Sequence, residues 1–227
     1  MKIIFLFVIF FSIEAASNDK KCRLEVAAKC LMDRHKFIKD YGTVLPTNEK
    51  ELIGQCRALE ELRNCLYNFS QNCQTSMDRI VMEFSFSGTG KNMEDFCNPD
   101  EQFYKNYLQE AECIKNNIGV WSSCFKDNLA SYEYALEDTS GSKFLIFCCG
   151  LRRLRSCVSD NFQSACSSTV ADLMKMQVEF VFSEWIVEMC LLYAESETCP
   201  TLPTGDDLKR TYKPGYFANY IEAFTQN

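Results

Sequence analysis

The chain has 227 residues and a net charge of −7 at neutral pH, from 31 acidic and 24 basic side chains. An acidic protein gains little from counterion release at a polyanion, so we expect no nucleic-acid partner. With 14 cysteines and a single histidine, disulfide bonds are a better explanation of the cysteines than zinc sites, whose ligands lie closer together in sequence.

The chain begins with a short apolar stretch. Lys2 precedes an apolar run over residues 3–13, and small residues follow at positions 15–17. This pattern is typical of a secretory signal peptide, which we place at residues 1–17. The run is shorter than the ~20 apolar residues of a spanning helix, so we expect no membrane span. The sequence thus predicts a secreted, extracellular protein whose cysteines pair in an oxidising environment.

Twelve of the cysteines form two rows of six with similar spacing. Each member of the second row lies 91 to 94 positions after its counterpart in the first. Such a repeat predicts a duplicated module, each copy closing its own three disulfides in a pairing that the spacing leaves open. The first row is Cys22, Cys30, Cys56, Cys65, Cys73 and Cys97, and the second is Cys113, Cys124, Cys148, Cys157, Cys166 and Cys190.

Two cysteines, Cys149 and Cys199, have no counterpart in the first half. Cys148 keeps the repeat register, and a bridge between neighbouring cysteines would strain the peptide between them. We therefore predict that Cys149 pairs with Cys199. Cys148 and Cys149 would project about 100° apart on a helix, so they can reach different partners.

Helical periodicity dominates the chain. Apolar residues recur in steps of three and four over residues 49–73 and again over 144–166, which predicts two equivalent helices with one buried face each. Residues 170–192 predict one or two strongly apolar helices. The run Asn98-Pro99-Asp100-Glu101 predicts a helix start with a capping asparagine and proline at the first helical position.

Few windows alternate apolar and polar residues, so we predict an all-α fold of two tandem disulfide-stapled modules with about four helices each. Loops are expected at 39–48, 87–92 and 139–142. The predicted domains are the signal peptide at 1–17, the first cysteine-rich helical repeat at 18–98, the second at 99–199, and a linker with an aromatic C-terminal tail at 200–227.

The two central helices share the motif C-x2-L-x2-L-R-x-C, with Leu59, Leu62 and Arg63 matching Leu151, Leu154 and Arg155. Together with the signal peptide and the duplicated helical body, this motif resembles secreted arthropod proteins of unknown function, the hemolymph glycoproteins. It has a related look to nematode extracellular proteins with a cysteine-rich helical domain. The resemblance covers residues 22–199 and implies an extracellular, disulfide-bonded glycoprotein without known catalytic residues. Cys148-Cys149 and Cys199 depart from the simple repeat.

We expect no enzymatic activity and no cofactor or metal. A Ser-His-Asp or Cys-His arrangement would have to use the only histidine, His35, which is flanked by Arg34 and Lys36 and is expected to be a solvated helix residue. The chain contains neither a G-x-S-x-G nor an H-E-x-x-H motif.

Three further features are candidate sites. The basic cluster of Arg152, Arg153 and Arg155 could bind an acidic partner. We expect it instead to be a solvated helix face opposite Leu151 and Leu154. Asn68 heads the one N-x-[ST] sequon and is the expected glycosylation site. A pocket for an apolar ligand could be lined by five side chains that are more often core residues: Met174, Phe180, Phe182, Trp185 and Met189.

The sequence therefore predicts a secreted, disulfide-rich extracellular binding or interaction protein of a body fluid or secretion. The alternative is a carrier of a small apolar ligand held between helices. The partner is an unknown extracellular protein in the first case and a small apolar ligand in the second.

Overall fold

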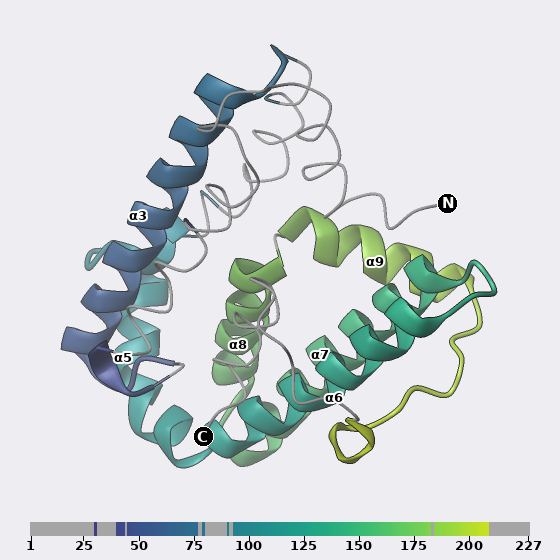
Figure 1. Ribbon diagram of the computed structural model, residues 1–227. Helices are drawn as coiled ribbons and strands as arrows, with labels where there is room; N and C mark the ends of the chain where they lie inside the picture. The colour runs from purple at the N-terminus through teal and green to yellow at the C-terminus, as the bar shows by residue number, and fades with distance from the viewer. Residues whose placement is uncertain are drawn as a thin grey trace.

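The computed structural model describes residues 30, 40–43, 45–76, 79, 90, 93–182 and 184–208, without the side chains at 184, 185 and 196. The predicted signal peptide, Cys22, His35, most of the predicted loop at 87–92 and the aromatic tail lie outside the described residues. Every regular element in the described part of the chain is a helix (Figure 1). The predicted all-α fold is confirmed.

The described residues of the second half form five α-helices, where about four were expected. They follow one long helix of the first half, and residues 93–97 are also helical. The elements in chain order are α3 (Glu49–Cys73), α5 (Gln102–Asn116), α6 (Ile118–Glu137), α7 (Lys143–Ala165), α8 (Ser168–Phe182), α9 (Glu184–Ser196) and the 3-10 helix η2 (Gly205–Asp207).

The two equivalent central helices form where the periodicity predicts them. Helix α3 begins at Glu49 because the side chain of Asn48 accepts a hydrogen bond from the Glu51 N–H at 3.0 Å. The apolar stretch at 170–192 forms two helices, α8 and α9.

The predicted helix start at Asn98 is wrong. Residues 98–101 form a turn, in which the Asn98 side chain accepts the Asp100 N–H at 3.1 Å and the Glu101 N–H donates to the Asn98 carbonyl at 3.0 Å. Helix α5 begins only at Gln102, and the Glu101 side chain makes no cap. Asparagine followed by proline suits such a turn as well as a helix N-terminus, which is why the local pattern misled.

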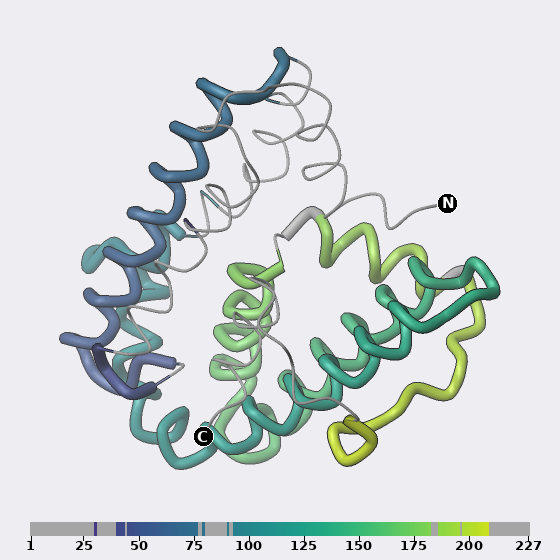
Figure 2. Tube along the Cα trace, in the orientation of Figure 1, coloured from purple at the N-terminus to yellow at the C-terminus, as the bar shows by residue number. Residues whose placement is uncertain are grey.

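Helices α6 and α7 form the best-packed pair of the structure, and Figure 2 shows them running antiparallel with the connection at residues 138–142. Gly141 takes a positive φ of 90°, which glycine adopts without strain. The Asp138 carboxylate accepts the Ser140 hydroxyl at 2.8 Å and the Ser142 N–H at 2.9 Å. These hydrogen bonds lower the pKa of Asp138.

Helix α7 is the centre of the core. It packs against α6, α8 and α9. Leu151, Leu154, Val158 and Phe162 on α7 are each at most 1% exposed and belong to the same buried cluster as Trp121. Each such side chain contributes about 1.5–3 kcal/mol on burial, so this one helix accounts for a large share of the apolar stabilisation.

The two halves of the repeat share one core. Leu52 and Leu59 of α3 belong to the same buried cluster as α7. Phe96 packs edge-on against Tyr107 and Phe180, with ring centroids 5.1 and 5.3 Å apart. The predicted boundary between residues 98 and 99 thus separates sequence repeats whose described residues are packed together, and the two-module layout stays a prediction.

Polar contacts also join the halves. The Tyr107 hydroxyl donates to the Pro46 carbonyl at 2.9 Å, and Gln55 of α3 donates to Gln177 of α8 at 3.1 Å. Burial, with the nearby Glu51 carboxylate, raises the pKa of Tyr107 well above its ordinary value. Its hydroxyl therefore stays protonated and able to donate across this contact.

The described disulfides lie within the halves, as predicted, and both halves use the same pairing. The second cysteine of each row pairs with the fourth, and the third pairs with the sixth. The described bridges of the two rows are Cys30–Cys65, Cys56–Cys97, Cys113–Cys166, Cys124–Cys157 and Cys148–Cys190.

This shared pairing predicts the partner of Cys73, which is disulfide-bonded. Its counterpart Cys166 pairs with Cys113, and Cys113 is the counterpart of Cys22. Because a duplicated module keeps its pairing geometry, we expect Cys22 to be bonded to Cys73. Non-reducing peptide mapping of the whole protein should recover the two cysteines in one linked peptide. Recovery of Cys22 joined to any other cysteine would refute the equivalence of the two rows.

The close approach of α6 and α7 gives a second prediction. A Cβ at Gly150 would lie 2.7 Å from the Ser131 Cβ, an atom fixed to the α6 backbone that cannot rotate away. Gly150→Ala should lower the free energy of unfolding by about 1–3 kcal/mol, measured by urea denaturation with the bridges intact. A Cβ at Gly119 of α6 meets nothing within 4 Å, so Gly119→Ala should have no cost. Equal effects of the two substitutions would contradict the packing described.

Candidate functional site

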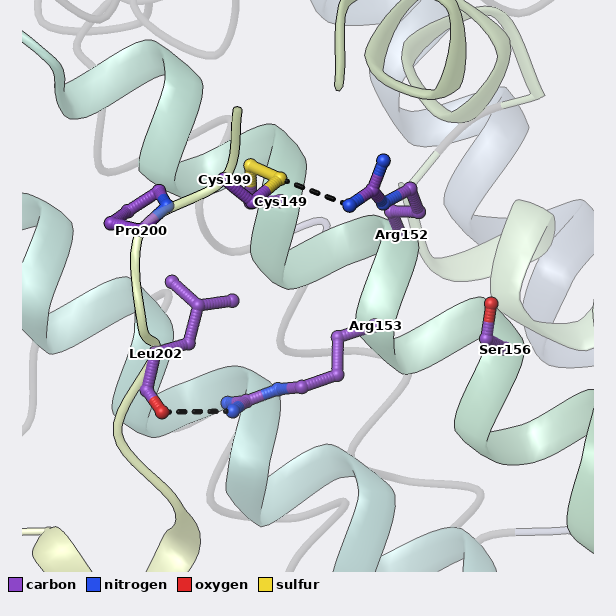
Figure 3. Close-up of a pocket in the computed structure, with 7 residues that line it drawn as sticks. All are labelled: Cys149, Arg152, Arg153, Ser156, Cys199, Pro200 and Leu202. Carbon is purple, nitrogen blue, oxygen red and sulfur yellow. Dashed lines mark hydrogen bonds between the residues drawn. A yellow bond between two sulfur atoms is a disulfide. The ribbon is translucent and has the colours of Figure 1, made fainter. Parts of the chain in front are cut away.

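The second half contains a hollow of about 270 Å³ between α7 and the segment that follows α9. We call residues 197–208, which include η2, the strap. Figure 3 shows the hollow with the Cys149–Cys199 bridge and Arg152 near one another and Arg153 reaching toward the Leu202 carbonyl. The lining residues are Cys149, Arg152, Arg153 and Ser156 of α7 and Cys199, Pro200 and Leu202 of the strap.

Helix geometry places the four α7 residues together. Positions 149, 152, 153 and 156 are separated by three, one and three residues, so they share one face of the helix. The neighbouring face carries Cys148, Leu151 and Leu154, which are buried against the core. The hollow therefore lies along the outer edge of the α7 core face, where the strap crosses it.

The predicted bridge between Cys149 and Cys199 is present, with Cα atoms 5.8 Å apart. The adjacent Cys148 forms its disulfide with Cys190 of α9 instead. Neighbouring residues project about 100° apart on a helix, so the two cysteines reach different partners. The Cys149–Cys199 bridge closes a loop with a sequence separation of 50, which the chain-entropy model values at about 4 kcal/mol. The bridge anchors the beginning of the strap.

Arg153 anchors the middle of the strap. Its guanidinium donates to the carbonyls of Leu202 at 3.3 Å and Pro203 at 2.6 Å. It also donates to two groups of α6, the Asp127 carbonyl and the Ser131 hydroxyl, the latter at 2.7 Å. One side chain of α7 thus connects three segments of the chain.

The expectation that the three arginines of α7 form a solvated helix face is wrong. Arg152 donates to the Ala194 carbonyl at the end of α9 at 2.7 Å and to the Cys199 Sγ at 3.2 Å. Arg155 lies 4.0 Å from the Glu179 carboxylate of α8. All three arginines are partly buried and bound within the protein, because the strap, α8 and α9 cover the face that the helical pattern leaves polar.

The end of the strap is held from α6. The Asp127 carboxylate accepts the Gly205 N–H at 2.7 Å. A capping box between Thr204 and Asp207 starts η2, with the Asp207 carboxylate accepting the Thr204 N–H at 2.8 Å and its hydroxyl at 3.0 Å. The segment predicted as a linker is irregular over 200–204, as expected. Hydrogen bonds with Arg153 and Asp127 hold its backbone.

The hollow is electropositive in an acidic protein. In the described part of the chain, neither Arg152 nor Arg153 has a carboxylate within the 4.0 Å ion-pair distance. Burial lowers the pKa of Arg153, and the nearby Asp127 carboxylate opposes that shift. A guanidinium has so high an intrinsic pKa that Arg153 stays charged at neutral pH despite this shift.

The four residues of the predicted apolar pocket whose side chains are described do not line this hollow. Met174, Phe180 and Phe182 are at most 6% exposed and belong to the core cluster. Phe182 stacks on Phe125 with ring centroids 6.2 Å apart. Met189 is half-buried, and the Trp185 side chain lies outside the description. A ligand pocket at these residues stays a prediction.

The predicted glycosylation site is accessible at its asparagine. Asn68 is exposed on α3, and its backbone carbonyl accepts a hydrogen bond from the Asn72 side chain at 2.7 Å. Ser70 of the same sequon is buried and donates to the Gln74 side chain at 2.8 Å. A glycan at Asn68 would therefore have to be attached before this part of α3 packs.

Sequence reasoning singled out the unmatched cysteines and the arginine cluster but did not join them. The signal was available in the register: Cys149, Arg152 and Arg153 lie close together on α7, at positions where the first half has other residues. Among the described residues no group of His, Cys, Asp or Glu side chains is arranged to hold a metal ion. Within those residues, no helix combines the length and the apolar character needed to span a membrane.

The sequence matches no protein-family model, no curated protein and no solved structure. The resemblance to secreted arthropod proteins stays an expectation.

The anchoring of the strap can be tested at Arg153. Arg153→Gln removes the charged donor for four oxygen acceptors, so the free energy of unfolding should fall by about 2 kcal/mol. Proteinase K should then cleave the strap. The Cys149–Cys199 bridge would still hold the beginning of the strap on α7. Arg155→Gln breaks only a 4.0 Å ion pair and should cost less than about 1 kcal/mol, leaving the strap resistant. Equal protease resistance of both variants would show that Arg153 does not hold the strap.

Proposed function

We propose that this chain is a secreted, disulfide-rich extracellular protein that acts by binding rather than by catalysis, with the hollow beside the Cys149–Cys199 bridge as its binding site. The family resemblance to secreted arthropod glycoproteins and the expected glycan at Asn68 are parts of the same proposal.

The observation that carries the proposal is the complete pairing of the described cysteines. Six bridges have both ends described, and Cys73 is bonded as well. Bridges in this number persist in oxidising surroundings and are reduced in the cytosol. They also make the binding face rigid, since α7 carries the hollow and is cross-linked to its neighbours.

The alternative, a carrier of a small apolar ligand in an inter-helix pocket, has less support. The large side chains of α8 that would line such a pocket have partners in the core, such as Phe96 for Phe180. Organic-solvent extraction of the native protein followed by mass spectrometry would support the carrier if a lipid were recovered in near-stoichiometric amount.

The proposal predicts the fate of the whole chain in a secretory cell. Expressed from its own first residue, the protein should appear in the medium without residues 1–17, with no titratable thiol. Glycosidase treatment should reduce its mass, and Asn68→Gln should abolish that change. Retention inside the cell with reduced cysteines would contradict the proposal, whereas a secreted protein lacking the glycan would remove only the Asn68 assignment.

A further inference from the structure

We infer that the hollow between α7 and the strap binds a small amphipathic anion, with its carboxylate at Arg152 and its short apolar body against Pro200, Leu202 and the disulfide. The inference rests on the proposed binding function and specifies the chemical class of the ligand.

The charge of the site favours an anion. The chain as a whole carries −7, yet the described residues that line the hollow include two arginines and no acidic side chain. Partly buried charges gain most from a counter-charge that also accepts their hydrogen bonds. A carboxylate supplies the counter-charge that no described residue provides within the 4.0 Å ion-pair distance of either arginine, and its oxygens accept hydrogen bonds.

The two arginines contribute differently. Arg153 donates to four acceptors on α6 and the strap, so its role in the site is mainly its charge. Arg152 has two acceptors, the Ala194 carbonyl and the Cys199 Sγ. A guanidinium carries five N–H donors, so Arg152 keeps donors for a ligand oxygen. Ser156, which is exposed at the rim, adds a hydroxyl.

The size and the remaining lining set the rest of the ligand. A volume of about 270 Å³ lies just below the ~300–1,000 Å³ range of sites for drug-sized molecules, so a short chain fits and a large one does not. Pro200 and Leu202 are apolar residues of the strap, and the Cys149–Cys199 bridge joins the strap to α7 beside Arg152. The lining thus offers guanidinium donors and apolar groups to the same small ligand.

The charged residues of the site have no counterpart in the first repeat. In the repeat register, Glu60 and Glu61 of α3 stand where α7 has Arg152 and Arg153, and Arg57 stands in place of Cys149. Both glutamates are exposed on α3. The copied helix thus has the opposite charge at these positions, and the second half adds the bridge and the strap that enclose the site.

Isothermal titration of the secreted, fully bridged protein with sodium octanoate tests the inference, with 1-octanol as the neutral ligand of equal chain length. Octanoate should bind with one-to-one stoichiometry, more weakly as salt is added, and octanol should bind at least about tenfold more weakly. Arg152→Gln should weaken octanoate binding about tenfold or more, Arg152→Lys should weaken it less, and Arg155→Gln should leave it unchanged.

Several outcomes would overturn the inference. Equal affinity for octanoate and octanol would identify an apolar site, and inorganic phosphate binding as tightly as octanoate would remove the apolar body from the ligand. Failure of the bridged wild-type protein to bind octanoate would reject the anion site, while secretion and disulfide pairing would still support the broader function. If Arg152→Gln does not fold, the wild-type comparison of the two ligands and the Arg152→Lys variant still decide the question.

Discussion

The cross-linking of helix α7 is the constraint on which the second half depends. Every bridge of that half has one end on α7 or on the residue directly after it, and the other ends lie on α5, α6, α9 and the strap. A helix bonded in several directions can neither rotate about its axis nor slide along it. The side chains on its remaining face are therefore held in place, which lowers the cost of ordering a binding site there.

The bridges work together with a continuous core. Leu151, Leu154 and Phe162 pack into a cluster that also includes residues of α3 and Phe96. Disulfides act mainly on the unfolded chain by restricting it, whereas buried apolar surface stabilises the folded state directly. In the described part of the first half, α3 likewise carries three disulfide-bonded cysteines, Cys56, Cys65 and Cys73.

The strap of the second half depends on donors from the neighbouring helices. The strap has no helix or strand partner over residues 200–204, so its carbonyl groups need donors from elsewhere. Arg153 supplies them, and Asp127 accepts the Gly205 N–H further along. Arg152 likewise donates a hydrogen bond to a backbone carbonyl in the last turn of α9. Once the strap is bound in this way, the space between it and α7 becomes a defined hollow with positive charge on one wall.

The sequence by itself determined the helical class, the extent of α3 and most of α7, and the repeat of the cysteines, because periodicity and spacing are local properties of a chain. It also determined the Cys149–Cys199 bridge, since those two cysteines alone stood outside the repeat. Only the tertiary structure decided which cysteines of each row meet, that Asn98 starts a turn, and that Arg153 is partly buried beneath the strap. The bridged cysteines of the two rows are 33 to 53 positions apart, and Arg153 reaches acceptors 22 to 50 positions away. No local pattern records which distant cysteine will be near or which distant backbone carbonyl will lack a donor. The turn at Asn98 is local, but its sequence suits a helix N-terminus equally well.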